Sequence, residues 1–108
     1  MERKFCYFYL SCEISDGSTI ANHLLERHLV ACAKFVPVAS SYWWNGVVEH
    51  ANETLIMFES AEDLFDEIEA EVKKIHSYDT FVLTQVTMTN VNEAAAKWLN
   101  DNLKEKDD

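Results

Sequence analysis

The side chains best suited to chemistry in this 108-residue sequence are three cysteines and four histidines. They are Cys6, Cys12, Cys32, His23, His28, His50 and His76. Thiolate and imidazole together suit soft or borderline ions such as copper and zinc. No CxxC, HxH or HExxH pattern occurs, so the sequence contains no local metal motif of high specificity.

Cys12 and His76 are the two candidates that the predicted topology could bring together. Cys12 ends the first predicted strand, and His76 begins a loop after the most regular predicted helix. A structural interpretation stays open, because a buried strand cysteine usually acts as a small hydrophobe, and a histidine just past a helix usually complements its dipole. Cys32, beside a predicted hairpin, is expected to be a packed core residue.

A second group of polar candidates follows the predicted hairpin turn and His76. Its members are Glu49, His50, Glu53, Tyr78 and Asp79. Alternation puts Glu49 and Glu53 on one strand face, where they could bind a cation, although carboxylates on an exposed hairpin are normally solvated. His76, Tyr78 and Asp79 have the side chains for acid–base work. No nucleophile elbow, phosphate loop or paired nucleophile and base accompanies them, so we do not expect an enzyme.

The elements that must position these residues are organised around the stretch Ser41–Glu49. Asn45-Gly46 is the strongest short signal for a tight two-residue turn, because both residues tolerate positive φ. Strand-like runs flank it at Ala31–Trp44 and Val47–Glu59. The sequence therefore predicts one long β-hairpin.

The adjacent residues Trp43 and Trp44 point to opposite faces of this hairpin. A small domain usually covers only one face of an antiparallel sheet, and an exposed indole is typical of a partner surface. We therefore expect subunits to meet here. The residues expected in an intersubunit cleft are Tyr42, Trp43, Trp44, Glu49, Tyr78 and Asp79; the two tyrosines could equally be plain interface aromatics.

The remaining elements follow from apolar periodicity and from turn and cap residues. We predict a central strand at Lys4–Glu13, a helix from Asp16 or Ser18 to Leu29, a helix from Ser60 to Ile75, a strand at Phe81–Thr89, a helix from Asn90 or Asn92 to Leu103, and a frayed tail at Lys104–Asp108. Ser60–Asp63 resembles a capping box. Pro37 predicts a bend or bulge in the first hairpin arm, because proline within a strand requires an edge or a bulge.

The order strand, helix, long hairpin, helix, strand, helix predicts an α+β fold. This order of elements is that of a ferredoxin-like split βαβ unit with a long central hairpin and an added C-terminal helix. The helices would cover one face of the antiparallel sheet. The other face also carries apolar residues, so we expect sheet-to-sheet oligomerisation.

Composition limits the class of protein further. We expect a single domain over residues 1–108, with an apolar content of 48% that suits a packed core. The net charge of −10 disfavours nucleic acid and anionic membranes as partners. Sparse, odd-numbered cysteines indicate reduced thiols and a cytoplasmic location. The N-terminal apolar run is too short for a membrane span and lacks the cleavage site of a signal peptide.

Taken together, these features resemble the CutA divalent-cation tolerance family over essentially the whole chain. The residues that carry the resemblance are Leu29-Val30-Ala31-Cys32-Ala33, Val36-Pro37, Tyr42-Trp43-Trp44-x-Gly46-x-x-Glu49 with Glu53, His76-x-Tyr78-Asp79, and Trp98-Leu99. The resemblance implies a ferredoxin-like fold in a tight trimer like that of the PII signalling proteins, and a role in tolerance of copper and other divalent metals.

The resemblance also implies a metal site, which this sequence matches only in part. Where copper ligands have been assigned in the family, they are a cysteine ending the first strand and two histidines. Cys12 and His76 match, whereas Ile75 stands at the other histidine position. The family's usual proline after the histidine is Ser77 here.

Three functions follow as hypotheses. The first is a cytoplasmic homotrimer that binds Cu(II) or another divalent metal, contains no organic cofactor and responds to metal ions. The second is a PII-like regulatory module that binds a small ligand between subunits. The third is a stable trimeric scaffold for protein partners, whose identity the sequence does not indicate.

Overall fold

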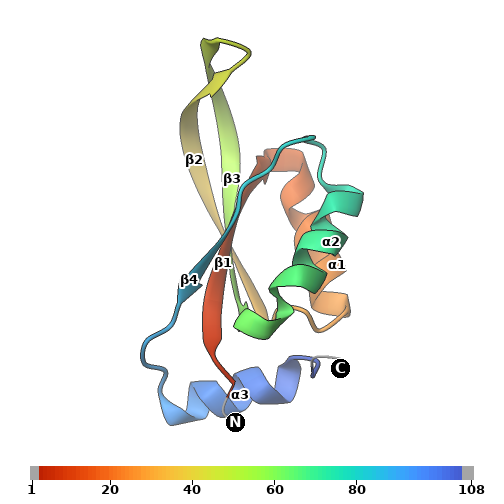
Figure 1. The fold of residues 1–108 in the computed structure, drawn as a ribbon, viewed down its shortest axis with the longest axis vertical. Helices are drawn as coiled ribbons and strands as arrows, with labels where there is room; N and C mark the ends of the chain where they lie inside the picture. Colours follow the sequence, from red (N-terminus) through yellow and green to blue (C-terminus); the bar gives the residue numbers. More distant parts are fainter. Residues whose placement is uncertain (1–2, 106–108) are drawn as a thin grey trace.

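The computed structural model describes residues 3–105 and has an α+β fold (Figure 1). Its elements are β1 (Phe5–Glu13), α1 (Gly17–Glu26), β2 (Cys32–Trp44), β3 (Val47–Ala61), α2 (Phe65–Ile75), β4 (Leu83–Thr87) and α3 (Glu93–Asn102). Short 3₁₀ turns at Ile14–Asp16 and Glu62–Leu64 lead into α1 and α2. The predicted order of strands and helices is confirmed.

The four strands form one antiparallel sheet in the order β2-β3-β1-β4. The whole of β1 pairs with β3, whereas only Cys6–Leu10 of β1 pairs with β4. β1 is thus a central strand, as predicted. The last strand is shorter than the predicted Phe81–Thr89, so the end of β1 beyond Leu10 has no strand on that side.

Of the two ways in which a strand accepts proline, the predicted bulge is wrong for Pro37 and the edge position is confirmed. Pairing of β2 with β3 continues in one register from Cys32 opposite Glu59 to Trp44 opposite Val47, with Pro37 opposite Thr54. Proline is accommodated here because β2 is an edge strand, where a missing N–H costs no ladder bond if it faces outward.

Two helices, α1 and α2, cover one face of the sheet, and α3 crosses its end near the start of β1 (Figure 1). The covered face carries alternate residues of β1, which are fully buried: Cys6, Phe8, Leu10 and Cys12. They pack with Ile56 and Phe58 of β3 and with apolar residues of both helices. Each fully buried large side chain contributes about 1.5–3 kcal/mol, so this layer is the main source of stability.

The starts of the helices agree with the predicted caps only in part. Asp16 is the N-cap residue of α1, but its side chain makes no cap bond and instead accepts a hydrogen bond from Ser77. Ser60 lies in β3, and its hydroxyl donates to the carbonyl of Leu29 at 2.6 Å. The capping-box prediction is therefore wrong, because the strand extends past Ser60 and its hydroxyl satisfies a buried carbonyl.

The C-terminal segment is anchored where we predicted fraying. The backbone N–H of Lys104 donates to the His28 carbonyl at 2.9 Å, its own carbonyl accepts from Arg3 at 2.6 Å, and its ammonium pairs with Glu67 at 2.9 Å. The rest of the predicted tail, from residue 106, lies outside the described residues.

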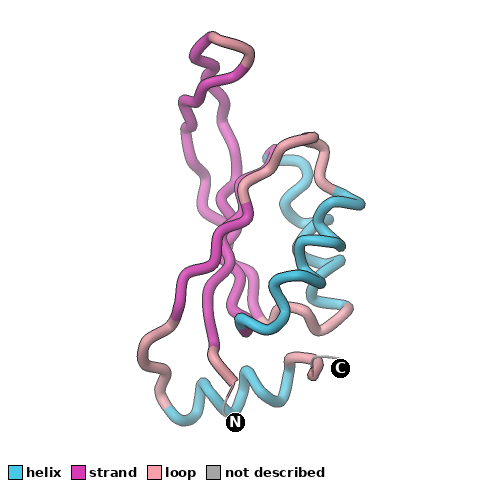
Figure 2. The backbone as a smooth tube through the Cα atoms, in the orientation of Figure 1, coloured by secondary structure: helices cyan, strands magenta, loops and turns pink. Residues whose placement is uncertain are grey.

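The face of the sheet opposite α1 and α2, called here the open face, carries many apolar side chains. Tyr7, Tyr9, Leu55 and Met57 are half-buried, and Val36 and Val86 are exposed. The outer half of the β2–β3 hairpin also extends well past the helices (Figure 2). There Trp43 is 75% exposed and Trp44 49%, so one chain alone leaves both indoles in contact with water.

Candidate functional site

The candidate site lies at the end of β1, where β4 no longer covers its edge. The segment after α2, residues 76–82, runs along this edge before it enters β4 (Figure 1). It brings the ring of His76 to the backbone carbonyl of Ser11, and Tyr78 next to Glu53 of β3. The ring of His76 thus contacts the residue that precedes Cys12, the other predicted metal ligand.

Both ring nitrogens of His76 make hydrogen bonds. The Nδ1 atom accepts the backbone N–H of Tyr78 at 3.0 Å, so Nε2 carries the proton and donates to the carbonyl of Ser11 at 3.0 Å. The ring also stacks on Phe81, with centroids 5.2 Å apart. Ser11 lies just past the part of β1 that pairs with β4, so His76 satisfies a carbonyl that the sheet leaves without a partner.

Cys12 faces the helix-covered side and is fully buried. Burial raises the pKa of its thiol to about 11, with a further contribution from the negative charges of Asp16, Glu53 and Glu13. The thiol is therefore protonated at neutral pH, whereas a metal ligand must be a thiolate. All three cysteines are free. The prediction that Cys32 is a packed core residue is wrong, because it lies half-buried on the edge strand, outside the core cluster.

A metal ion requires deprotonated ligand atoms with free lone pairs. Sulfur and imidazole nitrogen are suitable ligands for copper or zinc, but Cys12 holds its proton and His76 has no free lone pair. Within residues 3–105, no group of three or more His, Cys, Asp and Glu side chains is placed to hold a metal ion. In one chain these two residues do not by themselves fit a metal, and metal binding by them stays a prediction.

Glu53 is a buried carboxylate, whereas the sequence pattern predicted a solvated side chain. It is 5% exposed and accepts a hydrogen bond from the hydroxyl of Tyr78 at 2.8 Å. Glu13 stands directly opposite it in the ladder. Burial, the bond to Glu53 and nearby negative charge hold the pKa of Tyr78 above its ordinary value, so the phenol stays a donor.

Sequence reasoning also missed the part played by Ser77. Its hydroxyl donates to Asp16 Oδ2 at 2.7 Å, which ties the loop to the start of α1. With the bonds of His76 and Tyr78, three consecutive loop residues are anchored to three different segments. No local pattern signals these bonds, since the partners are far apart in sequence.

The other predicted cleft residues are spread over the outer hairpin and the loop. Tyr42 pairs with Glu49 across the hairpin, and both are exposed. Tyr42 is near enough to Tyr78 to contribute to its raised pKa. Trp43, Trp44 and Asp79 are exposed as well, so one chain brings only part of the predicted cleft together.

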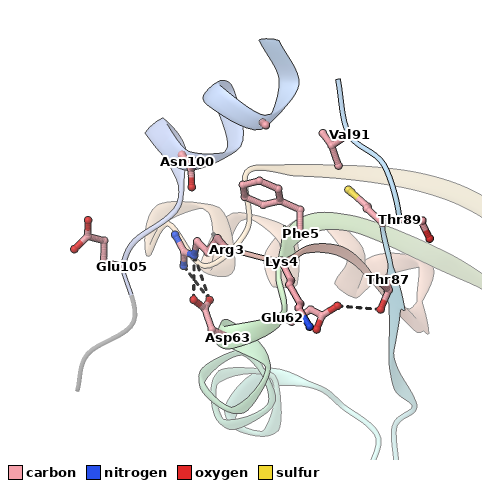
Figure 3. A pocket seen from close by; sticks show the side chains of 12 residues that line it. Arg3, Lys4, Phe5, Glu62, Asp63, Thr87, Thr89, Val91, Asn100 and Glu105 are labelled. Carbon is pink, nitrogen blue, oxygen red and sulfur yellow. Dashed lines mark hydrogen bonds and ion pairs between the residues drawn. The ribbon is translucent and has the colours of Figure 1, made fainter. Parts of the chain in front are cut away.

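A cavity of about 1070 Å³ lies elsewhere, between the start of β1, the end of β4 and α3 (Figure 3). Two interactions between lining residues form its polar part: an ion pair of Arg3 with Asp63, and a hydrogen bond from Thr87 to Glu62. Apolar atoms of Phe5, Met88 and Val91 line it further. Cys12, His76 and Glu53 do not line this cavity, so it is separate from the candidate site.

None of the helices in the described residues is long and apolar enough to cross a membrane.

Comparisons with known proteins place this fold and these residues in one family. The model of the CutA1 divalent ion tolerance protein family matches residues 6–102. The divalent-cation tolerance protein CutA of Pyrococcus horikoshii is 31% identical over 89 residues, which cover 82% of this chain and 87% of that protein. The CutA protein of Archaeoglobus fulgidus is 27% identical over 91% of this chain and 97% of its own length.

Solved structures agree with the sequence comparison. The crystal structure of CutA1 from Oryza sativa superposes with a TM-score of 0.92 at 26% identity, covering 96% of this chain and 97% of the other. Because the family model spans nearly all of the described sheet and helices and the backbone matches so closely, this chain belongs to the CutA1 divalent ion tolerance protein family.

Proposed function

We propose that this protein is a cytoplasmic homotrimer that takes part in the response to divalent cations by binding Cu(II) or another divalent metal, without catalysis and without an organic cofactor. Membership of the family supports the cation-tolerance role. The names of the P. horikoshii and A. fulgidus relatives describe the same role for those proteins. The sequence's sparse free cysteines support a reducing compartment.

The exposed apolar surface of one chain supports the trimer. The sheet order β2-β3-β1-β4 is consistent with a ferredoxin-like unit, and its open face and outer hairpin have no cover within one chain. A stable interface buries about 800 Å² per partner, and aromatic side chains such as Trp43 and Trp44 are typical anchors. A PII-like trimer would remove these side chains from water.

The single observation that carries the metal proposal is the contact of His76 with Ser11, the residue before Cys12. It supports the proposal because it brings the His76 ring to the residue that precedes Cys12 in the chain. To bind a metal, His76 must give up one of its two hydrogen bonds and Cys12 its proton. Since one chain supplies only two ligands, we propose that water or a neighbouring subunit supplies the others.

The test is a calorimetric titration of the reduced protein with Cu(II) and, separately, Zn(II), with the mass in solution measured by light scattering. We expect a trimer with saturable binding, and loss of that binding in Cys12→Ser and in His76→Ala. His50→Ala is the matched control, because His50 is an exposed histidine that lies on the outer hairpin and bonds only Ser41 among the described residues. It should bind metal like the wild type.

Two results would contradict the proposal in different ways. Binding that persists in both site variants but falls in His50→Ala would move the metal to the hairpin. A monomeric wild type would overturn the trimer whatever the titration shows.

A second function has its own observation in its favour. The Glu53–Tyr78 pair, with Tyr42 nearby, forms a polar group on the open face where a neighbouring subunit would lie. A PII-like module would bind a small cationic or neutral ligand there, because Glu53 and Glu13 repel anions. A thermal-shift screen of small amines and neutral metabolites tests this, and a Tm that no compound raises would count against it.

A further inference from the structure

The helix α3 is attached to the rest of the molecule more weakly than α1 and α2. It crosses the end of the sheet that lies opposite the hairpin turn (Figure 1). Among its ten residues, all of which the structure describes, only Leu99 is buried, whereas α1 buries four residues and α2 two. An element with few buried apolar contacts opens locally at a lower free energy than the core does.

The polar links between α3 and the rest of the chain lie at its C-terminal end. Among the described residues, those from 89 to 101 make no hydrogen bond or ion pair to another element. The ring of His28 donates from Nδ1 to the carbonyl of Asn102 at 3.0 Å. The carbonyl of His28 accepts from the Lys104 N–H at 2.9 Å, and the Lys104 carbonyl accepts from Arg3 Nη2 at 2.6 Å. These three bonds are called here the α3 latch.

The groups that receive the C-terminal end of α3 are held in place by other contacts. Asp63 binds the guanidinium of Arg3 through Nε at 3.1 Å and Nη2 at 3.0 Å (Figure 3). The ammonium of Lys104 adds an ion pair with Glu67. His28 follows α1 with φ of 57°, a left-handed conformation that favours glycine. Glycine at this position would avoid the strain but would lose the ring that bonds α3.

Towards its N-terminal end, α3 faces a hollow. Ala96 and Asn100 of α3 line the cavity of about 1070 Å³, together with Phe5 and Met88 of the sheet side (Figure 3). The N–H of Met88 donates to the carbonyl of Phe5 at 3.1 Å, and residues 89–92 then lead to the helix. This part of α3 is therefore connected to the sheet through a short linker, with a cavity in between.

We propose that α3 is a latched lid over this cavity. When the α3 latch breaks, the helix moves away from the sheet as one unit on the linker of residues 89–92, while the sheet, α1 and α2 stay folded. The motion opens the cavity and exposes Leu99 and Leu103, which are buried in the closed state. The latch and the burial of these two leucines together set how rarely the lid opens.

The experiment is native-state hydrogen exchange of the intact protein, measured by mass spectrometry in urea concentrations below the unfolding transition. An opening that exposes little surface depends weakly on urea, whereas global unfolding depends on it strongly. We expect the amides of α3 to exchange through an opening with weak urea dependence. The amides of β1 and β3 should exchange only through global unfolding.

Two variants of the latch and one control make the assignment specific. Arg3→Met removes a charged donor and should speed exchange in α3 by about tenfold or more. His28→Gly suits the left-handed turn and removes the ring bond, so it should speed exchange in α3 by about threefold or more without speeding exchange in β1. Asp101→Ala removes an exposed ion pair with Lys97 inside the same helix and should not speed exchange.

Two outcomes would overturn the proposal. In one, α3 and β1 exchange with the same free energy and the same urea dependence, which would mean that the helix opens only with the whole protein or that a second subunit holds it. In the other, α3 exchanges separately but at the wild-type rate in both latch variants, so the latch does not hold the lid. Neither readout depends on metal binding.

Discussion

Two parts of strand β3, around Glu53 and around Glu49, give the same kind of side chain very different surroundings. Glu53 and Glu49 share a face and are two alternations apart, yet Glu53 is 5% exposed and Glu49 is exposed. At Glu53 a loop from the other side of the sheet crosses over and Tyr78 donates a hydrogen bond. Glu49 pairs with Tyr42 in the opposite arm of the hairpin and is exposed. Around Glu53 the chain supplies the partner of a buried side chain, whereas on the outer hairpin around Glu49 one chain leaves the side chains exposed to water.

The largest expected effect comes from the core between the sheet and the helices. Phe58→Ala removes a fully buried ring between the sheet and the helices and should lower the free energy of unfolding by about 3–5 kcal/mol. Urea unfolding followed by circular dichroism measures it. Lys97→Ala is the control, since its pair with Asp101 is exposed and should change stability by less than about 0.5 kcal/mol. Equal effects of the two variants would contradict the assigned core.

The next prediction concerns the outer hairpin and distinguishes an effect on assembly from an effect on folding. Trp44→Ala and Trp43→Ala should each weaken association by about 2 kcal/mol or more, as expected for aromatic anchors of an interface. Far-ultraviolet circular dichroism should stay native, because neither indole is part of the core of one chain. Light scattering over a dilution series provides the measurement. If both variants keep the wild-type mass at all concentrations, the outer hairpin is not the interface.

A smaller effect tests the bond that distinguishes Glu53 from Glu49. Tyr78→Phe keeps the ring but leaves the buried carboxylate without its donor, which should cost about 1–3 kcal/mol. Glu49→Gln should leave stability almost unchanged, because Glu49 is exposed. Chemical denaturation at neutral pH compares the two. If Tyr78→Phe leaves the free energy of unfolding unchanged, water replaces the tyrosine hydroxyl as the donor to Glu53.

The last effect appears only at alkaline pH. Burial raises the pKa of Cys12 to about 11 from an ordinary 9.0, so the unfolded chain releases this proton more readily than the folded one. Stability should therefore fall as pH rises from about 9 to about 11, and Cys12→Ser should show a shallower fall. Cys6 adds to the same trend, since burial raises its pKa to about 12. Thermal unfolding between pH 8 and pH 11 tests the sign, and a rise would contradict it.

Several features of the fold follow from local patterns and were predictable. The Asn45-Gly46 turn, the alternation along β1 and the apolar stripe of α2 depend on neighbours a few residues apart, so the element order and the long hairpin could be read directly. The bulge at Pro37 and the length of β4 could not. Both depend on which strands lie beside them, and this is a property of the sheet.

The sequence by itself determined the order of the elements, the hairpin and the family resemblance, because periodicity, turn chemistry and motif spacing are local. Only the tertiary structure decided the state of the candidate site. The bonds of His76 to Ser11, Ser77 to Asp16 and Tyr78 to Glu53 join residues 65, 61 and 25 positions apart. Such partners meet only after the sheet has formed, and their burial then decides which groups hold their protons.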